Sequence, residues 1–481
     1  MHKDTKIKKN NKATIKIALV QCPAFGIDRP PIALGYLSAF LRRYGYATVI
    51  FDFNIDLYSK TSEENRKFWD FQYVFQWLDN NYFANEGLLP KSYFKAWAYE
   101  VVNSSCDVIG FSLQSSSLTA SINLAREIKE IAPEKIIVFG GPLNLSYSID
   151  HTYYLLGLEN TSKVRIVDII VLGEGEETFI DILNRLERGI TLEGCPGSVS
   201  AKAGKFFNNG LRPLIKDINN IPFPDFSGFP DKYKYKKKLP ILSSRGCVHK
   251  CVFCDDTLMW EKFRFRAAGN IVDEIRLRKN QGIEFLEFND LLINGNLQQL
   301  SAMCDLLIQE RIEMPWGGCA SVDKRMDINF FDKLRRAGCR YLNYGIESAS
   351  PKVLMDANKG FKIEEAKKNI ELTYKSGISV CTNWIVGFPT ETISDFEQTL
   401  KFVIENFWYL KNNIMVNSFI LKGYSFIFQN QKKYGIIYDK ERSWNSLNGL
   451  NTINERKRRY DEFIQLVATL GDNPAHQTFQ K

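Results

Sequence analysis

The sequence lacks any long hydrophobic run. No stretch of about 18 consecutive apolar residues occurs among its 481 residues, so no transmembrane helix is expected. A signal peptide is not expected either, because Lys16 interrupts the short apolar run Ile15–Val20. These two absences predict a cytoplasmic protein, in which thiols stay reduced. Internal repeats and low-complexity segments are also missing, and 44% hydrophobic residues predict a globular chain.

The chain has only a small excess of positive charge. Sixty-three Lys and Arg against 55 Asp and Glu leave a formal net charge of +8. Much of the excess lies in a basic amino-terminal tail, residues 1–13, and in the run Lys232–Lys238. A solvated tail and a linker account for both runs, so no nucleic-acid partner is expected.

Cysteine is distributed unevenly along the chain. The scattered members of the ten are expected to be buried thiols, namely Cys22, Cys106, Cys195, Cys304, Cys319, Cys339 and Cys381. The other three, Cys247, Cys251 and Cys254, form a Cys-x3-Cys-x2-Cys loop after a predicted strand. Three thiolates in one short loop can hold an inorganic cluster, and the missing fourth cysteine leaves one iron open. A zinc site with His249 as the fourth ligand is the alternative. His249 lies between the first two cysteines, which is an awkward position for a single chelating loop.

Two long parts of the chain alternate between strand-like and helix-like patterns, and they predict an α/β fold. The first, residues 14–204, predicts a doubly wound (Rossmann-like) parallel sheet with an aromatic-rich insertion at about 54–100. Its predicted strands are Ile15–Val20, Thr48–Phe53, Val108–Leu113, Ile136–Phe139 and Val167–Leu172. The second part, residues 241–407, predicts a partial (β/α) barrel of the TIM type. Its predicted strands are Ile241–Ser244, Phe285–Phe288, Gly317–Ala320, Tyr341–Gly345 and Ser379–Val386. A linker at 205–240, rich in proline and lysine, and a carboxy-terminal extension at 408–481 complete the predicted organisation.

The cysteine loop and the segments that follow it resemble the radical S-adenosylmethionine superfamily. The resemblance implies that Cys247, Cys251 and Cys254 hold a [4Fe–4S] cluster whose open iron binds S-adenosylmethionine. It also implies a nucleoside pocket, with Glu347 of the segment Tyr344–Ser348 on the ribose hydroxyls. The other residues that it assigns to S-adenosylmethionine are Phe253 before the last cysteine, Asn289 and Asp290 after the second strand, and Ile385 and Gly387 of the segment Ile385–Glu391. Asn289 departs from the family, which has an acidic residue at that place.

The amino-terminal part resembles the cobalamin-binding branch of the same superfamily. The segments that carry this resemblance are Pro30–Pro31, Leu34–Leu37, Asp107–Gly110, Gly140–Pro142 and Gly173–Thr178. It implies that a corrinoid approaches the backbone at the glycines Gly140, Gly141, Gly173 and Gly175. The chain has no Asp-x-His-x-x-Gly motif, so the resemblance implies no cobalt ligand from such a histidine.

Together the two resemblances imply a cobalamin-dependent radical enzyme that methylates an unactivated carbon or phosphorus centre of a small metabolite. They also imply a reductant partner such as flavodoxin or ferredoxin. Three alternatives remain open: a radical oxidoreductase or cyclase without net methyl transfer, a radical enzyme that binds no corrinoid, and an iron–sulfur electron-transfer or scaffold protein. Glu347 and the segment Gly387–Glu391 argue against the last, because an electron carrier needs no nucleoside pocket. A methylthiotransferase is disfavoured because no second cysteine triad precedes Cys247.

Overall fold

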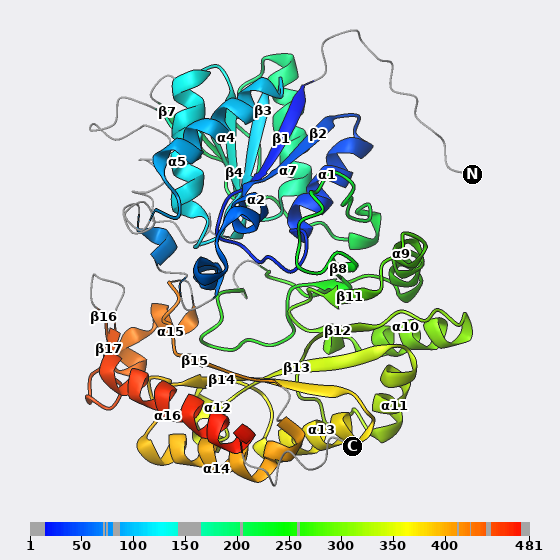
Figure 1. Ribbon diagram of the computed structural model, residues 1–481, viewed down its shortest axis with the longest axis vertical. Helices are drawn as coiled ribbons and strands as arrows, with labels where there is room; N and C mark the ends of the chain where they lie inside the picture. The colour runs from blue at the N-terminus through cyan, green and yellow to red at the C-terminus, as the bar shows by residue number, and fades with distance from the viewer. Residues whose placement is uncertain are drawn as a thin grey trace. The chain divides into compact units, whose positions relative to one another are not determined.

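Two α/β units make up the computed structural model of the protein (Figure 1). The first contains Met1–Ile215 and Asn220–Lys236, and the second contains Lys216–Asn219 and Lys237–Lys481. The structure describes residues 15–70, 73, 76–79, 87–142, 165–202, 205–256, 260–410, 413–423, 425–438 and 444–472. The predicted basic tail, residues 1–13, lies outside the described residues.

The first unit is built on a seven-stranded sheet with the order β2-β1-β3-β4-β5-β6-β7. The strands are β1 (Lys16–Gln21), β2 (Ala47–Asp52), β3 (Val108–Ser112), β4 (Ile136–Gly140), β5 (Ile169–Val171), β6 (Ser198–Lys202) and β7 (Lys205–Asn208). Strands β1 to β5 pair in parallel, which confirms the predicted sheet. The antiparallel pair β6 and β7 was not predicted. The two strands of a hairpin are joined by a short turn and not by a helix, so the sequence shows no helical pattern between them.

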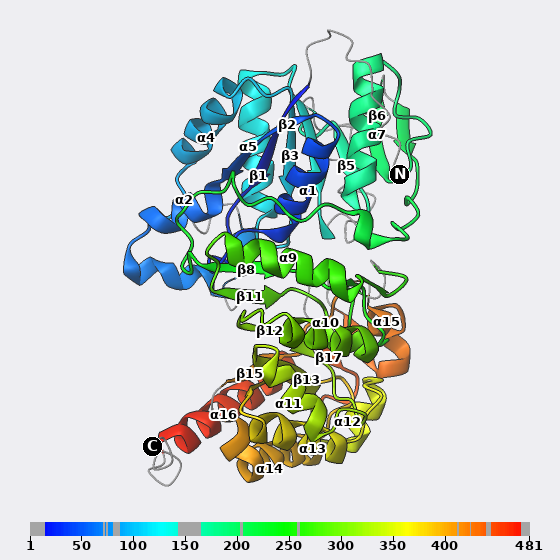
Figure 2. The same cartoon turned by 90° about the vertical axis from the view of Figure 1, so that its right-hand side faces the viewer.

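Helices cover both faces of this sheet (Figure 2), as a doubly wound fold requires. They are α1 (Ile32–Arg43) and α7 (Gly175–Arg188) on one face, and α2 (Phe53–Lys60), α4 (Lys91–Asn103) and α5 (Leu118–Ile131) on the other. Side chains of β1 alternate accordingly: Ala18 and Val20 belong to the core beneath α4 and α5, while Leu19 lies on the side of α7. Aromatic residues of the predicted insertion 54–100, among them Trp77 and Trp97, are buried in that core.

The predicted linker 205–240 contains ordered structure. Its first residues form β7, and Lys238–Ile241 forms the first strand of the second unit, β8. In between, the Tyr233 hydroxyl donates to the buried carboxylate of Asp52, and Lys232 pairs with Asp56 at 2.7 Å. Segment 220–236 is therefore part of the first unit, because its polar side chains find their partners there.

The second unit is a six-stranded parallel sheet with the order β8-β11-β12-β13-β14-β15, which is the chain order expected of a partial (β/α) barrel. The strands after β8 are β11 (Phe285–Phe288), β12 (Trp316–Ala320), β13 (Cys339–Glu347), β14 (Ser379–Val386) and β15 (Ile414–Ser418). The helices are α9 (Ala268–Asn280), α10 (Leu297–Gln309), α11 (Ile328–Arg336), α12 (Pro351–Asp356), α13 (Ile363–Lys375), α14 (Ile393–Leu410), α15 (Phe426–Gln429) and α16 (Ile453–Asp472). The sheet extends past the predicted end of the barrel at 407, since β15 lies in the predicted extension.

The predicted strand Ile241–Ser244 is wrong in its bounds. The chain leaves the sheet after Ile241, and β9 (Ser244–Arg245) pairs antiparallel with β10 (Arg264–Phe265) instead. The backbone N–H of Ser243 and its hydroxyl both donate to the buried carboxylate of Asp290, which turns the chain out of the sheet.

Alternation along β13 decides which side chains face away from the helices. Leu342, Tyr344 and Ile346 are buried, and the Tyr344 hydroxyl lies 2.8 Å from Thr373 of α13. The residues that alternate with them along the strand, Glu347 included, are partly exposed on the other face. A site on that face is therefore open to ligands, whereas the helix face is filled.

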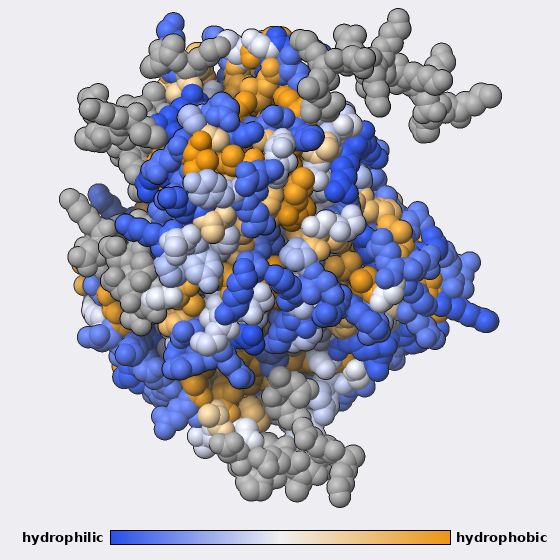
Figure 3. Space-filling view, turned by 45° about the horizontal axis from the view of Figure 1, so that its top comes forward, coloured by the Kyte–Doolittle hydropathy of each residue, from blue (hydrophilic) through white to orange (hydrophobic). Residues whose placement is uncertain are grey.

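None of the helices in the described ranges is long and apolar enough to cross a membrane. Large exposed hydrophobic side chains, such as Tyr44, Met355 and Leu447, are scattered along the chain. On the face drawn in Figure 3, hydrophobic residues form small groups among hydrophilic ones. Such scattered exposure is normal for protein surfaces and implies no partner.

Candidate active site

The cysteine loop begins directly after β9, and hydrogen bonds to Asp290 hold the residues before it. Oδ1 of Asp290 accepts hydrogen bonds from the hydroxyls of Ser243 (2.6 Å) and Ser244 (2.5 Å), and Oδ2 accepts from the Ser243 N–H (3.0 Å). Gly246 follows with φ +91°, and a Cβ there would lie 2.7 Å from the Lys262 carbonyl oxygen. The loop therefore needs glycine at this position. Its entry is held by a buried carboxylate with three donors.

Cys247, Cys251 and Cys254 are partly exposed, and burial raises the pKa of each thiol, that of Cys254 to about 12. Cys251 lies close enough to the other two to raise both of their pKa values further. Ligands of one tetrahedral zinc ion lie about 3.8 Å apart, because each Zn–S bond is about 2.3 Å. The three sulfurs do not gather within 4.8 Å of one another. The three thiols as placed here therefore do not form a closed site for a single zinc ion.

His249 does not complete a zinc site. Within the described residues it joins no group of ligand atoms that lie within 4.8 Å of one another. Its Nε2 is buried without a hydrogen-bond partner, and burial lowers its pKa. Cys254, Asp255 and Asp256 do form such a group, but Asp256 accepts from the Cys254 thiol at 3.6 Å and Asp255 pairs with Lys422 at 3.0 Å. Contacts within the protein therefore explain that group.

Val252 ties the cysteine loop to the rest of the barrel. Its N–H donates to the Ala357 carbonyl at 3.2 Å, and its carbonyl accepts from the Ile427 N–H at 2.9 Å. Its side chain belongs to a buried cluster that also contains Phe388, Phe419, Ile427 and Trp444. Phe253 and Ile385 both pack against this cluster. The structure thus places against one cluster two residues that the sequence resemblance assigns to S-adenosylmethionine.

Glu347 ends β13 in an unusual backbone conformation, with φ +70°. A non-glycine residue in this region is strained, and such strain gathers at functional sites. A Cβ on Gly345 would lie 2.5 Å from Oε1 of Glu347, so the glycine makes room for the carboxylate. The side chain of Glu347 is 14% exposed, which leaves it accessible at the edge of the sheet.

Lys359 is a site residue that sequence reasoning missed. Its Nζ lies 3.2 Å from Oε1 of Glu347, and only 10% of its side chain is exposed. Burial disfavours the charged lysine, but Glu347 and Cys251 outweigh this effect and raise its pKa. The ammonium also lies 5.8 Å from the centre of the Phe253 ring. The signal in the sequence is the triplet Asn358–Lys359–Gly360, because Asn and Gly favour a tight turn; in the structure both flanking residues have positive φ.

The remaining residues predicted to contact S-adenosylmethionine are placed as follows. Asn289 is exposed at the carboxyl end of β11, whereas the Asp290 carboxylate is buried under the cysteine loop. Gly387 follows β14 with φ +77°, and its N–H donates to Oε2 of Glu391 at 2.7 Å. Asp290 and Gly387 are therefore engaged in holding local structure, and contact of these residues with a ligand stays a prediction.

The predicted corrinoid glycines lie at the carboxyl ends of β4 and β5. Gly141 has φ +123°, and a Cβ there would lie 2.4 Å from the Leu113 carbonyl oxygen. The local backbone therefore requires this glycine whether or not a ligand binds. Gly140 and Gly175 differ, because a Cβ at either would meet only side chains at 3.7 Å or more. No such constraint explains those two positions.

Residues 241–403 match the family model of the Radical SAM superfamily. This range contains the cysteine loop, Glu347, Lys359 and Ile385. Residues 241–403 are a radical SAM domain. The predicted recognition is thereby confirmed for residues 241–403, which contain the three thiols, the Glu347–Lys359 pair and part of the hydrophobic cluster. Phe419, Ile427 and Trp444 of that cluster lie beyond this range.

Two curated relatives extend the similarity beyond the radical SAM domain. An uncharacterized methyltransferase from Pyrococcus horikoshii is 29% identical over 62% of this chain and 63% of its own length. The anaerobic magnesium-protoporphyrin IX monomethyl ester cyclase of Rubrivivax gelatinosus is 25% identical over 77% of this chain and 61% of its own length. The chain thus spans about three fifths of the length of these relatives.

A solved structure shows the same fold over nearly the whole chain. The radical S-adenosylmethionine methyltransferase TsrM from Kitasatospora setae, solved with cobalamin and a [4Fe–4S] cluster bound, matches with a TM-score of 0.72 at 14% identity. The match covers 96% of this chain and 90% of that one. The arrangement of a doubly wound unit followed by a radical SAM domain is therefore confirmed as the fold.

Proposed function

We propose that the protein is a cobalamin-dependent radical S-adenosylmethionine methyltransferase acting on an unactivated carbon or phosphorus centre of a small metabolite. The observation that carries the proposal is the loop of Cys247, Cys251 and Cys254 in a segment that matches the Radical SAM family model, near the Glu347–Lys359 pair. Cys247, Cys251 and Cys254 would hold a [4Fe–4S] cluster, which would pass one electron from a reductant of the flavodoxin or ferredoxin class to S-adenosylmethionine and so break its C–S bond, giving methionine and a 5′-deoxyadenosyl radical.

Different residues of the radical SAM domain contact different parts of the cluster and of S-adenosylmethionine. Cys247, Cys251 and Cys254 bind the cluster. Lys359 places a positive charge between Glu347 and the cysteine loop, where it can meet the methionine carboxylate. Glu347 offers its free Oε2 to the ribose hydroxyls. Phe253 and Ile385 line an apolar surface suited to the adenine ring and keep water away from it.

The doubly wound unit supports the cobalamin part of the proposal. Ligands of such sheets bind at the carboxyl ends of the strands, where Gly140, Gly173 and Gly175 lie. When bound there, cobalamin supplies the methyl group. The likeness to TsrM covers this unit as well, and that protein is described with cobalamin bound.

Ring formation without net methyl transfer is the second candidate function. It is favoured by the similarity to the magnesium-protoporphyrin cyclase, which covers 77% of this chain. Product mass separates the two candidates, because a methylated product is 14 Da heavier than its substrate, about the mass of one CH₂ unit.

The test uses the full chain, reconstituted anaerobically with iron, sulfide and hydroxocobalamin and then desalted. We expect about four irons per chain, retained cobalt, and 5′-deoxyadenosine formation when S-adenosylmethionine and a reductant are added. Cys251→Ala is expected to abolish 5′-deoxyadenosine formation. Cys319→Ala is the matched control, since Cys319 is a partly exposed cysteine of the same unit outside the loop. Stoichiometric zinc in place of iron would overturn the proposal, and loss of cobalt on desalting would overturn its corrinoid part.

A further inference from the structure

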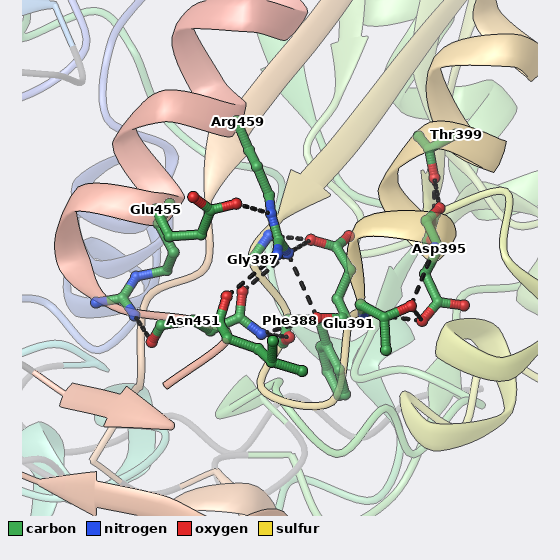
Figure 4. Close-up of polar contacts among 12 residues, drawn as sticks. Gly387, Phe388, Glu391, Asp395, Thr399, Asn451, Glu455 and Arg459 are labelled. Carbon is green, nitrogen blue, oxygen red and sulfur yellow. Dashed lines mark hydrogen bonds and ion pairs between the residues drawn. The ribbon is translucent and has the colours of Figure 1, made fainter. Parts of the chain in front are cut away.

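The turn after β14, residues Gly387–Glu391, is closed by a buried ion pair from the carboxy-terminal helix. Oε2 of Glu391 accepts from the Gly387 N–H at 2.7 Å and from Nη1 of Arg459 at 2.6 Å (Figure 4). Glu391 is 1% exposed and Arg459 is fully buried. Arg459 lies on α16, 68 residues further along the chain. The shape of the turn therefore depends on a distant helix.

Asn451 forms a second set of hydrogen bonds to the same turn. Its Nδ2 donates to the carbonyl oxygens of Phe388 and Glu391, each at 3.0 Å, and of Pro389 at 3.3 Å. Its Oδ1 accepts from Nη1 of Arg459 at 2.9 Å. Asn451 and Arg459 thus form one hydrogen-bonded unit around the turn (Figure 4).

The guanidinium of Arg459 is held in a single orientation. Nε donates to Oε1 of Glu455 at 3.0 Å, and Nη2 donates to the Leu450 carbonyl at 3.1 Å. Burying such an ion pair costs about as much desolvation energy as it returns, so stability alone is a poor reason to keep it. A planar guanidinium whose nitrogens all have hydrogen-bond partners instead fixes where those partners lie.

The turn borders the residues that we assign to the nucleoside. Strand β14 pairs with β13, and Trp384 lies opposite Glu347, three residues before Gly387. Phe388 of the turn belongs to the hydrophobic cluster against which Phe253 and Ile385 pack. A shift of the turn therefore moves the walls of the proposed nucleoside pocket directly.

We propose that Arg459 and Asn451 are positioning residues for the nucleoside end of S-adenosylmethionine. They act through the turn Gly387–Glu391 and touch neither the cofactor nor the reacting atoms. This inference rests on the proposed function, and it assigns part of the cofactor pocket to α16, outside the range that matches the family model. The carboxy-terminal helix is then required for cofactor selectivity as well as for folding.

The test measures iron content and the dissociation constants for S-adenosylmethionine and for its analogue with hypoxanthine in place of adenine. With Arg459→Met in the reconstituted full chain, we expect S-adenosylmethionine binding to weaken about tenfold, which corresponds to about 1.4 kcal/mol. Preference for adenine over hypoxanthine should fall too, while iron content stays the same. Arg459→Lys is expected to recover part of the affinity. Lys457→Met is the matched control, since Lys457 is exposed on the same helix.

A second variant keeps the test decisive if Arg459→Met does not fold. The double variant Glu391→Gln with Arg459→Met leaves no unpaired buried charge, so it is expected to fold but to keep the loss of selectivity. An unchanged adenine preference in the double variant would overturn the inference and leave the proposed function intact. Wild-type protein that loads iron but binds no S-adenosylmethionine would instead overturn the proposed function.

Discussion

At the scale of single residues, the proposed cofactor pocket depends on one carboxylate in a strained backbone. Glu347 has positive φ, pairs with Lys359, and occupies space that Gly345 leaves free. Because these three residues form one unit, each offers a separate way to disturb the same carboxylate.

Glu347→Gln is expected to weaken S-adenosylmethionine binding by about 1.5–3 kcal/mol without removing the cluster, because an amide replaces charge-assisted hydrogen bonds only in part. Gly345→Ala should also weaken S-adenosylmethionine binding, since the added methyl group displaces the carboxylate of an otherwise unchanged Glu347. Equilibrium dialysis with labelled S-adenosylmethionine measures both variants. Gly269→Ala, in open space on α9, is the control, and unchanged affinity in both pocket variants would show that the ribose contact lies elsewhere.

Asp52 in the first unit carries a pH-dependent contribution to stability. Burial raises its pKa from 3.8 to about 6, although the Tyr233 hydroxyl and the Ile55 N–H favour its ionised form. A folded-state pKa above the unfolded value means that stability is full below about pH 4 and is lost as the pH rises through about 6. The loss amounts to about 3 kcal/mol at pH 7.

Asp52→Asn is therefore expected to remove this loss. Relative to wild type, the melting temperature of the variant should rise between about pH 4 and about pH 6 and level off above, because asparagine does not ionise and still caps α2. Thermal unfolding of both proteins at intervals of about half a pH unit, from below the unfolded pKa of 3.8 to above the folded pKa of about 6, measures the difference. Parallel curves for the two proteins would contradict the assignment.

At the scale of elements, the cysteine loop and the two turns after β13 and β14 are each held by another element. The loop is held by Asp290 at the end of β11, the first turn by Thr399 and Asp395 of α14, and the second by α16 (Figure 4). Short loops cannot specify their own shape, so these buried polar contacts do it.

Asp290→Asn is expected to lower iron loading, because its Oδ1 can still accept from the hydroxyls of Ser243 and Ser244 but its amide nitrogen cannot accept from the Ser243 N–H as Oδ2 does. The free energy of unfolding should fall by about 1–3 kcal/mol, the usual cost of leaving buried donors unsatisfied. Iron content after reconstitution and urea unfolding measure the two effects. Asp273→Asn is the control, since Asp273 is 62% exposed in a surface ion pair, where less than about 1 kcal/mol is at stake.

At the scale of the whole molecule, the two units carry different parts of the proposed reaction. The radical SAM domain carries the thiols and the nucleoside pocket, whereas the doubly wound unit carries the glycines proposed for cobalamin. Substitutions in one unit should therefore weaken binding of the cofactor proposed for that unit and leave binding of the other cofactor unchanged.

Gly175→Leu is expected to reduce retained cobalamin while S-adenosylmethionine cleavage without substrate continues. A Cβ at Gly175 meets nothing closer than 3.7 Å, and the backbone there does not require glycine, so the effect would report on the ligand. Gly141 is a poor test, because its backbone strain confounds folding with binding. Cobalt content after desalting measures the effect, with Gly269→Leu as the control. Full cobalt retention in Gly175→Leu would place the corrinoid elsewhere.

The sequence by itself determined the alternating elements, the five parallel strands of the first sheet and the chain order of the second, because periodicity is a local property. It also determined the cysteine loop, whose ligands lie within eight residues of one another. Only the tertiary structure decided that Lys359 pairs with Glu347, that Asp290 holds the cysteine loop, and that Arg459 closes the turn after β14. These contacts join residues 12, 47 and 68 positions apart, so no local pattern announces them. A buried charge must find a partner, and the partner lies on an element that only the folded chain brings near.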